Sequence, residues 1–393
     1  MKVTIGGTLE NTSPTTSSPT TSPTLTVIIP APSSAIKPFE SAEATAGILL
    51  SSVKFVPSTN ALYANVSASP FVVSKGDKDK EFSFLPLEEL GGDQCSKISS
   101  LAVFADARIG GIFDNYWHTV VTFGMAMYWH LPLRFRTSSD IALVIKHPTL
   151  QPWHTEEEKE HLVSADWLTD HGVGVNVIKL LFPGGIYVVD INNRDYGTFC
   201  ADQAYVQTVA WHGDRDKEGG EHNIEDVWDF RTRIMTAISL PNERTAVKGG
   251  KIVWVSRAKA LYRKHILNEE DLISQLRNDY PSATVDVVDM ESMTLKEQAT
   301  VFADASLVVM VRGAASVNTM YLSREATVFW INFGDGFEPF PHFYDSWFSV
   351  AGYVPSTLDR TGQGPNFNNM QLLPNEFWQH FIPVLELAGF SKG

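Results

Sequence analysis

The sequence SLVVMVRGAASVNTMYLSREATVFWI, residues 306–331, holds the features that decide the fold of this chain. Two apolar runs, LVVMV and TVFWI, have the length and the β-branched content of buried strands. Between them lie small residues and then a segment that we predict to be a helix. A strand, a helix and a second strand in so short a stretch form a crossover unit, which places both strands parallel in one sheet.

The same alternation continues upstream. KIVWVSR (251–257) and ATVDVVD (283–289) are typical of strands, and NEEDLISQLRNDY (268–280) and TLKEQATVFADA (294–305) are typical of helices. Asn268 is a favourable N-cap, and Thr294 with Glu297 three residues later forms a capping box. We therefore predict the α/β fold class, with a parallel sheet wound by crossovers.

The remaining segments carry weaker patterns. We expect strands at 141–145 and 185–191 and helices at 115–129, 155–167, 226–238 and 375–390, the last with Phe377, Phe381 and Leu385 at helical spacing. Residues 12–34 are mostly Ser, Thr and Pro, which cannot bury enough apolar surface to offset the entropy of ordering. This composition predicts a disordered tail or stem over residues 1–35.

Composition limits the classes of function. A length of 393 residues favours two domains, and 44% hydrophobic with 19% charged residues is typical of a globular protein. The net charge of -14 argues against a nucleic-acid partner. We find no run of 18 apolar residues and no signal-peptide core, so we expect a soluble chain or a membrane anchor outside this sequence.

The cysteines and histidines give no metal site. Cys95 and Cys200 could form one long-range disulfide or remain two buried thiols, and the sequence leaves both open. The histidines at 147, 154, 161 and 171 lack the spacing of metal ligands, so we predict neither a metal site nor a cofactor.

Two segments follow predicted strands at the sheet edge where open α/β folds bind ligands. The first contains Arg257 and Lys259, and the second runs from Arg312 to Asn318. A glycine at 313 lets a ligand approach the backbone, and the small residues 314–316 open a helix whose free N–H groups favour anions. These segments predict a diphosphate site, although tight packing and surface ion pairs are the alternatives. The pattern is neither a Walker A loop nor GxGxxG.

Taken in the order in which they occur along the chain, these motifs resemble those of glycosyltransferase family 61. The resemblance rests on the strand ending in Arg, the NEEDL helix, the EQ…F helix and the RGAASVN turn, with FDNYWHTVVTFG similar to a helix start of the family's first domain. It implies a GT-B-like architecture of two Rossmann-like domains facing a cleft. The N-terminal domain (36–245) would face the acceptor, the C-terminal domain (246–372) would bind the nucleotide-sugar, and a closing helix (373–393) would return to the N-terminal domain.

The resemblance also implies a function. We expect an inverting transferase without an obligatory metal, moving xylose or N-acetylglucosamine from a UDP-sugar to a hydroxyl of a glycan or glycoprotein in the Golgi or ER lumen. The alternative is a nucleotide-sugar-binding module without transfer activity.

The expected roles follow from this chemistry. Arg257 and Arg312, with the helix start at Gly313, Ala314, Ala315 and Ser316, would stabilise the departing diphosphate. Lys259 and Arg263 are further cations, and their alternative is a solvated basic face. Asn318 would bind ribose or sugar, or else make a structural contact. His118 is the first candidate for the base and Asp114 the second, while Glu221 and His222 could contact the acceptor.

The chain departs from the family pattern at several positions of the turn and the last strand. Arg312 stands where the family has His, Ala315 where it has its second Gly, and Ser316-Val317 where it has Leu-Thr. Asn332 replaces the usual acid, with Asp335 nearby. Arg312 could bind the diphosphate, indicate a different donor or mark a lost activity.

Overall fold

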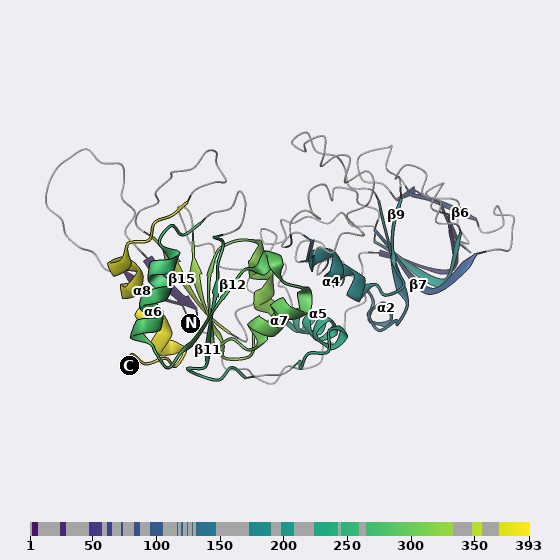
Figure 1. The fold of residues 1–393 in the computed structure, drawn as a ribbon. Helices are drawn as coiled ribbons and strands as arrows, with labels where there is room; N and C mark the ends of the chain where they lie inside the picture. The colour runs from purple at the N-terminus through teal and green to yellow at the C-terminus, as the bar shows by residue number, and fades with distance from the viewer. Residues whose placement is uncertain are drawn as a thin grey trace, which may run out of the picture. The chain divides into compact units, whose positions relative to one another are not determined.

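The fold is described from a computed structural model. The described residues are 2–6, 24–28, 47–56, 61–64, 72–73, 82–86, 95–104, 116, 119–120, 124, 128, 131–146, 173–189, 198–207, 224–242, 245–258, 265–332, 348–355 and 369–393. The chain divides into two compact units. The C-terminal unit is made of Met1–Lys37 and His222–Gly393, and the N-terminal unit is made of Pro38–Glu221. Each unit is built on one sheet (Figure 1).

The sheet of the C-terminal unit has the strand order β1-β2-β15-β14-β13-β11-β12. The parallel strands are β11 (Lys251–Val255), β12 (Thr284–Val288), β13 (Leu307–Val311), β14 (Thr327–Ile331) and β15 (Ser349–Val354). β11 lies between β12 and β13, so the chain winds first to one side of β11 and then to the other. This is the doubly wound order, and its topological switch point falls between β11 and β13. The predicted α/β class is confirmed.

Helices cover both faces of this sheet. They are α5 (Ile224–Ala237), α6 (Glu269–Asp279), η6 (Met290–Ser292), α7 (Leu295–Ala303), η7 (Ala314–Tyr321) and α8 (Pro374–Leu387). α6 and α8 lie on one side of the sheet, and α7 lies on the other (Figure 1). The predicted capping box is present at the start of α7, where Thr294 and Glu297 each accept a hydrogen bond from the backbone N–H of the other.

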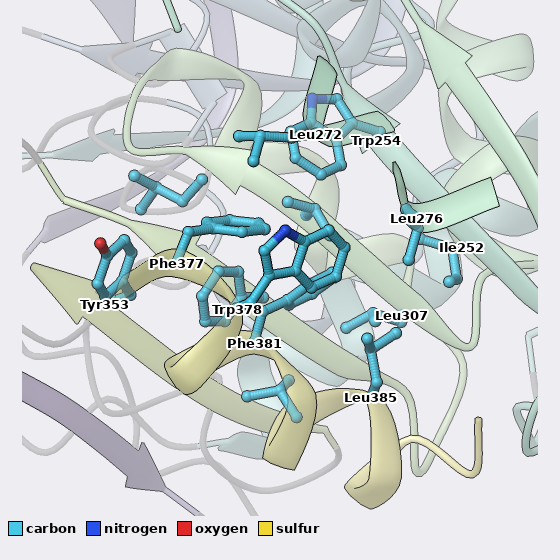
Figure 2. Close-up of a cluster of buried hydrophobic side chains, with 14 of the residues drawn as sticks. Ile252, Trp254, Leu272, Leu276, Leu307, Tyr353, Phe377, Trp378, Phe381 and Leu385 are labelled. Atoms are coloured by element: carbon cyan, nitrogen blue, oxygen red, sulfur yellow. The ribbon is translucent and has the colours of Figure 1, made fainter. Parts of the chain in front are cut away.

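The closing helix α8 packs on the sheet of its own unit. Phe377, Trp378 and Phe381 enter the same buried cluster as Trp254 of β11 and Phe329 of β14 (Figure 2). The aromatic stripe explains this packing, because it covers one face of β11, β13, β14 and β15 and removes a large apolar area from water. The expected return of the helix to the N-terminal domain stays a prediction.

The Ser/Thr/Pro-rich N-terminal segment contributes two strands to the same sheet. β1 (Lys2–Gly6) pairs antiparallel with β2 (Thr24–Ile28), and β2 pairs antiparallel with β15. These strands correct the prediction of a disordered tail for those residues. KVTIG precedes the Ser/Thr/Pro-rich part and TLTVI lies within it, and the β-branched residues of both suit a sheet edge.

The N-terminal unit contains an eight-stranded mixed sheet of order β5-β6-β4-β3-β10-β7-β8-β9. Its strands are β3 (Gly47–Val56), β4 (Ala61–Ala64), β5 (Val72–Val73), β6 (Phe82–Pro86), β7 (Ser96–Phe104), β8 (Ile141–Lys146), β9 (Ile186–Val189) and β10 (Phe199–Gln207). β10, β7, β8 and β9 run parallel, and two helices are described, α2 (Leu133–Arg136) and α4 (Val173–Leu181). The strands expected at 141–145 and 185–191 are present as β8 and β9.

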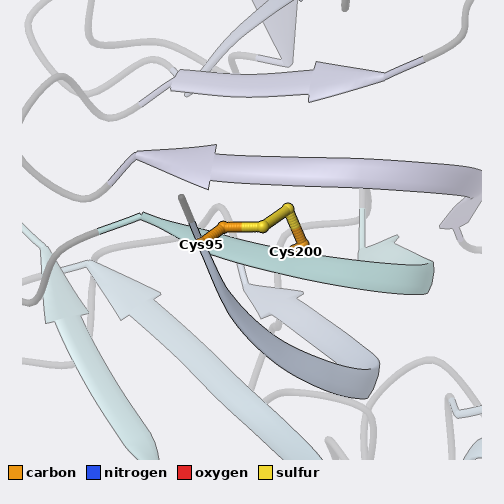
Figure 3. Close-up of a disulfide and its surroundings, with 2 residues drawn as sticks. All are labelled: Cys95 and Cys200. Atoms are coloured by element: carbon orange, nitrogen blue, oxygen red, sulfur yellow. A yellow bond between two sulfur atoms is a disulfide. The ribbon is translucent and has the colours of Figure 1, made fainter. Parts of the chain in front are cut away.

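A disulfide joins the two cysteines and closes the question that the sequence left open. Cys95 directly precedes β7 and Cys200 lies in β10, with their Cα atoms 5.6 Å apart (Figure 3). The two strands are parallel neighbours in the middle of the sheet. The bridge therefore cross-links positions 105 residues apart in the sequence, and it restricts the unfolded chain strongly.

Candidate functional site

The switch point places Arg257 beside Gly313. Both residues lie just beyond the carboxyl ends of adjacent strands, Arg257 after β11 and Gly313 after β13. The strand hydrogen bonds continue past these ends, because the N–H of Ser256 donates to Val288 O (2.9 Å) and that of Arg312 donates to Ile331 O (3.0 Å). The edge that bears the predicted ligand site is thus held on both sides by neighbouring strands.

The guanidinium of Arg257 lies directly against the backbone of Gly313. A Cβ added to Gly313 would stand 1.9 Å from Nη2 and 2.7 Å from Cζ of Arg257. Nη1 also donates to the carbonyl oxygen of Arg312, at 3.4 Å. The φ of Gly313 is 168°, which is extended backbone open to any residue. Glycine is therefore needed here for close approach, and the group that approaches is the arginine side chain.

The segment after Gly313 is a 3-10 helix, η7, where the sequence predicted an α-helix. Its first closed turn is marked by the N–H of Ser316, which donates to Gly313 O at 2.9 Å. The N–H groups of Ala314 and Ala315 precede that turn and have no carbonyl acceptor within the helix. Residues 316–323 are buried, so packing on every side favours the narrower helix. A helix therefore starts at Ala314, and anion binding at that start stays a prediction.

Arg312 adds a second cation to this edge. Its side chain is exposed, whereas Arg257 is half-buried. The carbonyl oxygen of Arg312 accepts a hydrogen bond from Arg257. Two guanidinium groups beside a helix start concentrate positive charge in a chain whose net charge is -14, and this arrangement suits a diphosphate.

Asn318 lies away from solvent, and its amide is used inside the protein. Its side chain is completely buried, and Nδ2 donates to Oε1 of Gln298 at 2.8 Å. Gln298 in turn donates to the carbonyl oxygens of Met290 and Met293, at 2.7 and 3.1 Å. This contact is the structural alternative that the sequence left open, and it ties η7 to α7 and to the turn that precedes α7.

The neighbouring Glu297 has a local structural role in the capping box of α7. The backbone N–H and the hydroxyl of Thr294 donate to its carboxylate and hold the pKa of Glu297 below its usual range. Similarly, Asn268 stands at the N-cap of α6 without capping it, because its amide bonds the backbone of Leu372 instead. Several motif residues of this unit therefore hold its turns through hydrogen bonds within the protein.

Asn332 follows β14, directly beside Arg312 in the sheet. The side chain is 1% exposed, and neither its amide nitrogen nor its oxygen has a hydrogen-bond partner among the residues that the structure describes. An amide that is buried without hydrogen-bond partners lowers the stability of the folded state. Asn332 is therefore an unusual residue beside the switch point.

Other predicted site residues lie outside the described part of the chain. They are the candidate bases Asp114 and His118, the cations Lys259 and Arg263, and the possible acceptor contacts Glu221 and His222. Their roles remain predictions. Conversely, the sequence assigned no role to Ser256, which begins the first candidate segment, or to Glu269; the two side chains contact each other close to Arg257 at 2.5 Å. The only signal for them was their position, at a strand end and a helix start.

The described residues contain neither a metal-binding cluster nor a membrane-spanning helix. No group of three or more His, Cys, Asp or Glu residues there could hold a metal ion. No helix there is long and apolar enough to cross a bilayer.

The fold is thus that of an α/β protein with a doubly wound sheet, and two arginines and the start of η7 lie at the carboxyl edge of its switch point. The family model for Glycosyltransferase 61 matches residues 116–329, more than half of the chain and parts of both units. The chain therefore belongs to glycosyltransferase family 61, and its activity class is glycosyl transfer. No curated protein matches the chain.

Proposed function

We propose that the chain transfers a sugar, xylose or N-acetylglucosamine, from a UDP-sugar to a hydroxyl of a glycan or glycoprotein, with inversion at the anomeric carbon. The observation that carries the proposal is the seating of the Arg257 guanidinium on Gly313 at the switch point. A permanent planar cation there, next to the start of η7, provides bidentate hydrogen bonds for a diphosphate. As the glycosidic bond to the donor breaks, negative charge grows on that diphosphate, and the same groups stabilise it.

The second requirement is a base for the acceptor hydroxyl. We propose His118 for this role and Asp114 as the second candidate, both supplied by the N-terminal unit. The two units would form a GT-B architecture with the donor on the C-terminal side. A neutral imidazole is suited to accept the proton as the hydroxyl attacks the anomeric carbon.

The disulfide supports a lumenal site of action. Disulfides persist in oxidising compartments such as the ER lumen and are rare in the cytosol. The Cys95–Cys200 bridge lies between central strands of the N-terminal sheet, where its loss would loosen the fold. This supports the proposal that the chain works on glycans or glycoproteins of the secretory pathway.

The test of the site measures binding of UDP and of inorganic pyrophosphate by calorimetry. Arg257→Ala should abolish binding of both and leave the thermal unfolding temperature nearly unchanged. Arg277→Ala is the matched control. Arg277 lies in the last turn of α6 and donates to the carbonyl oxygen of Val285 near the start of β12, away from the carboxyl edge of the sheet. Equal affinity of wild type and Arg257→Ala for UDP would refute this site.

The test of the activity is transfer and hydrolysis across a panel of UDP-sugars with glycan and glycoprotein acceptors. We expect slow release of free sugar without acceptor, faster transfer with the correct one, and the same rates after treatment with EDTA. UDP-sugar binding without turnover across the panel would instead identify a binding module. Loss of turnover in EDTA that Mn²⁺ restores would refute the metal-independent mechanism.

A further inference from the structure

The side chain of Glu269 connects the core of the C-terminal unit to the turn that carries Arg257. Glu269 is the first residue of α6 and is 9% exposed. One carboxylate oxygen accepts from Nε1 of Trp254 at 2.8 Å, and the other accepts from the hydroxyl of Ser256 at 2.5 Å. The start of a helix favours the negative charge, so the carboxylate is stabilised in this place.

Ser256 continues this connection into the turn after β11. Its hydroxyl oxygen accepts from the backbone N–H of Ala258 at 3.1 Å while it donates to Glu269. The two hydrogen bonds bracket Arg257, because one fixes the residue before it and the other the residue after it. The backbone of Arg257 is thus held from both sides, and its guanidinium rests on Gly313.

The two hydrogen bonds of Glu269, which we call its Trp254 arm and its Ser256 arm, connect it to different parts of the unit. Trp254 is 1% exposed and belongs to the buried cluster shared by α6, α8 and the sheet, so its arm anchors the carboxylate in the core (Figure 2). The Ser256 arm leads to the ligand edge of the sheet. A carboxylate that only stabilised the fold would not need its second hydrogen bond to reach Ser256, whose hydroxyl also accepts from the N–H of Ala258.

We propose that Glu269 and Ser256 are positioning residues, which hold the Arg257 turn in the geometry that binds the donor diphosphate. The inference rests on the proposed function, since it assigns the purpose of the turn to that diphosphate. Pre-organisation is the physical reason. A guanidinium already fixed in its bound orientation loses less entropy when the anion binds than one on a mobile turn.

The test compares two variants that remove one arm each. Ser256→Ala deletes the link to the turn, and Trp254→Phe deletes the link to the core and leaves Ser256 bonded to Glu269. We expect Ser256→Ala to weaken UDP and pyrophosphate binding about tenfold, in the range of one hydrogen bond to a charged group. Trp254→Phe should lower the unfolding temperature more and change UDP affinity less than twofold. Ser256→Thr, which keeps the hydroxyl, should restore affinity.

A second readout does not depend on a ligand. Hydrogen exchange of a peptide covering Ser256 to Ala258 should accelerate in Ser256→Ala and remain at the wild-type rate in Trp254→Phe. Unchanged exchange and unchanged UDP affinity in Ser256→Ala would overturn the positioning role, and so would equal losses of affinity in both variants. If Ser256→Ala accelerates exchange but wild type and Arg257→Ala bind UDP equally, the turn is held as inferred and the diphosphate site is the part that fails.

Discussion

Replacing Gly313 with Ala tests whether the contact with Arg257 forms the ligand site. The added Cβ would lie 1.9 Å from Nη2 of Arg257, and ordinary van der Waals contact begins at 3.4 Å. The guanidinium must therefore move by at least 3.4 minus 1.9, which is 1.5 Å. The backbone need not move, because a φ of 168° is open to alanine and the opposing group is the end of a flexible side chain.

A shift of this size is large for a hydrogen bond and small for the fold. A bond to phosphate that begins near 2.8 Å ends beyond about 4 Å, where it no longer exists. One hydrogen bond to a charged group is worth about 1.5–3 kcal/mol, and about 1.4 kcal/mol is a factor of ten in affinity. Gly313→Ala should therefore weaken UDP binding about 10- to 100-fold, while the unfolding temperature stays within a degree or two of wild type.

The assay is calorimetric titration with UDP, arranged as a double-mutant cycle with Arg257→Lys. The lysine variant keeps a cation but has no planar group to meet the added methyl, so Gly313→Ala should cost much less affinity in that background. An undiminished loss in the lysine background would show that the methyl acts on something other than the guanidinium. Binding by Gly313→Ala within twofold of wild type would refute the reasoning altogether.

Three further predictions concern stability. Replacing both Cys95 and Cys200 by Ala should lower the free energy of unfolding of the N-terminal unit by about 2–4 kcal/mol in urea titrations, since the bridge closes a long loop; unchanged stability would mean that the unfolded chain is compact there without it. Burial lowers the pKa of His380, partly offset by Glu376, so the unfolded state binds more protons and stability should fall as pH drops below about 6.5. His380→Gln should flatten that slope, and an equal slope in both proteins would assign it to other groups. Asn332→Leu removes two buried polar atoms without described partners and should raise the free energy of unfolding in urea titrations by about 1–2 kcal/mol; a decrease would show that the amide is bonded in solution.

The C-terminal unit could be predicted well from sequence because its signals are local. Each strand is a short apolar run that ends at a polar turn, and the capping box at Thr294 and Glu297 sets the start of α7 within the sequence itself. The position of Arg257 and Gly313 at one edge also followed, since parallel strands bring their carboxyl ends together.

The rest depended on contacts between distant residues. The pairing of β2 with β15 joins segments more than 300 residues apart, and no composition rule for a Ser/Thr/Pro-rich segment anticipates it. The direction in which α8 packs is set by the sheet beneath it, and its periodicity shows only that one face is apolar. The role of Asn318 was left open for the same reason, because Gln298, its hydrogen-bond partner, lies 20 residues away on another helix.

The geometry at Arg312 indicates how this position can hold Arg where the family pattern has His. If the side chain at this position were essential for the fold of the site, the structure would bury it, yet it is exposed and the contact to Arg257 comes from its carbonyl oxygen. Any residue at position 312 supplies that carbonyl, so a change of side chain leaves the contacts of Arg257 with the carbonyl of residue 312 and with Gly313 intact. Arg312→His should accordingly preserve Arg257-dependent UDP binding and lower the affinity only through the loss of a permanent charge, with a weaker dependence on salt than wild type. If Arg312→His abolished UDP binding and Arg257→Ala did not, the anion would be held by the exposed cation, and the contact between Arg257 and Gly313 would be packing alone.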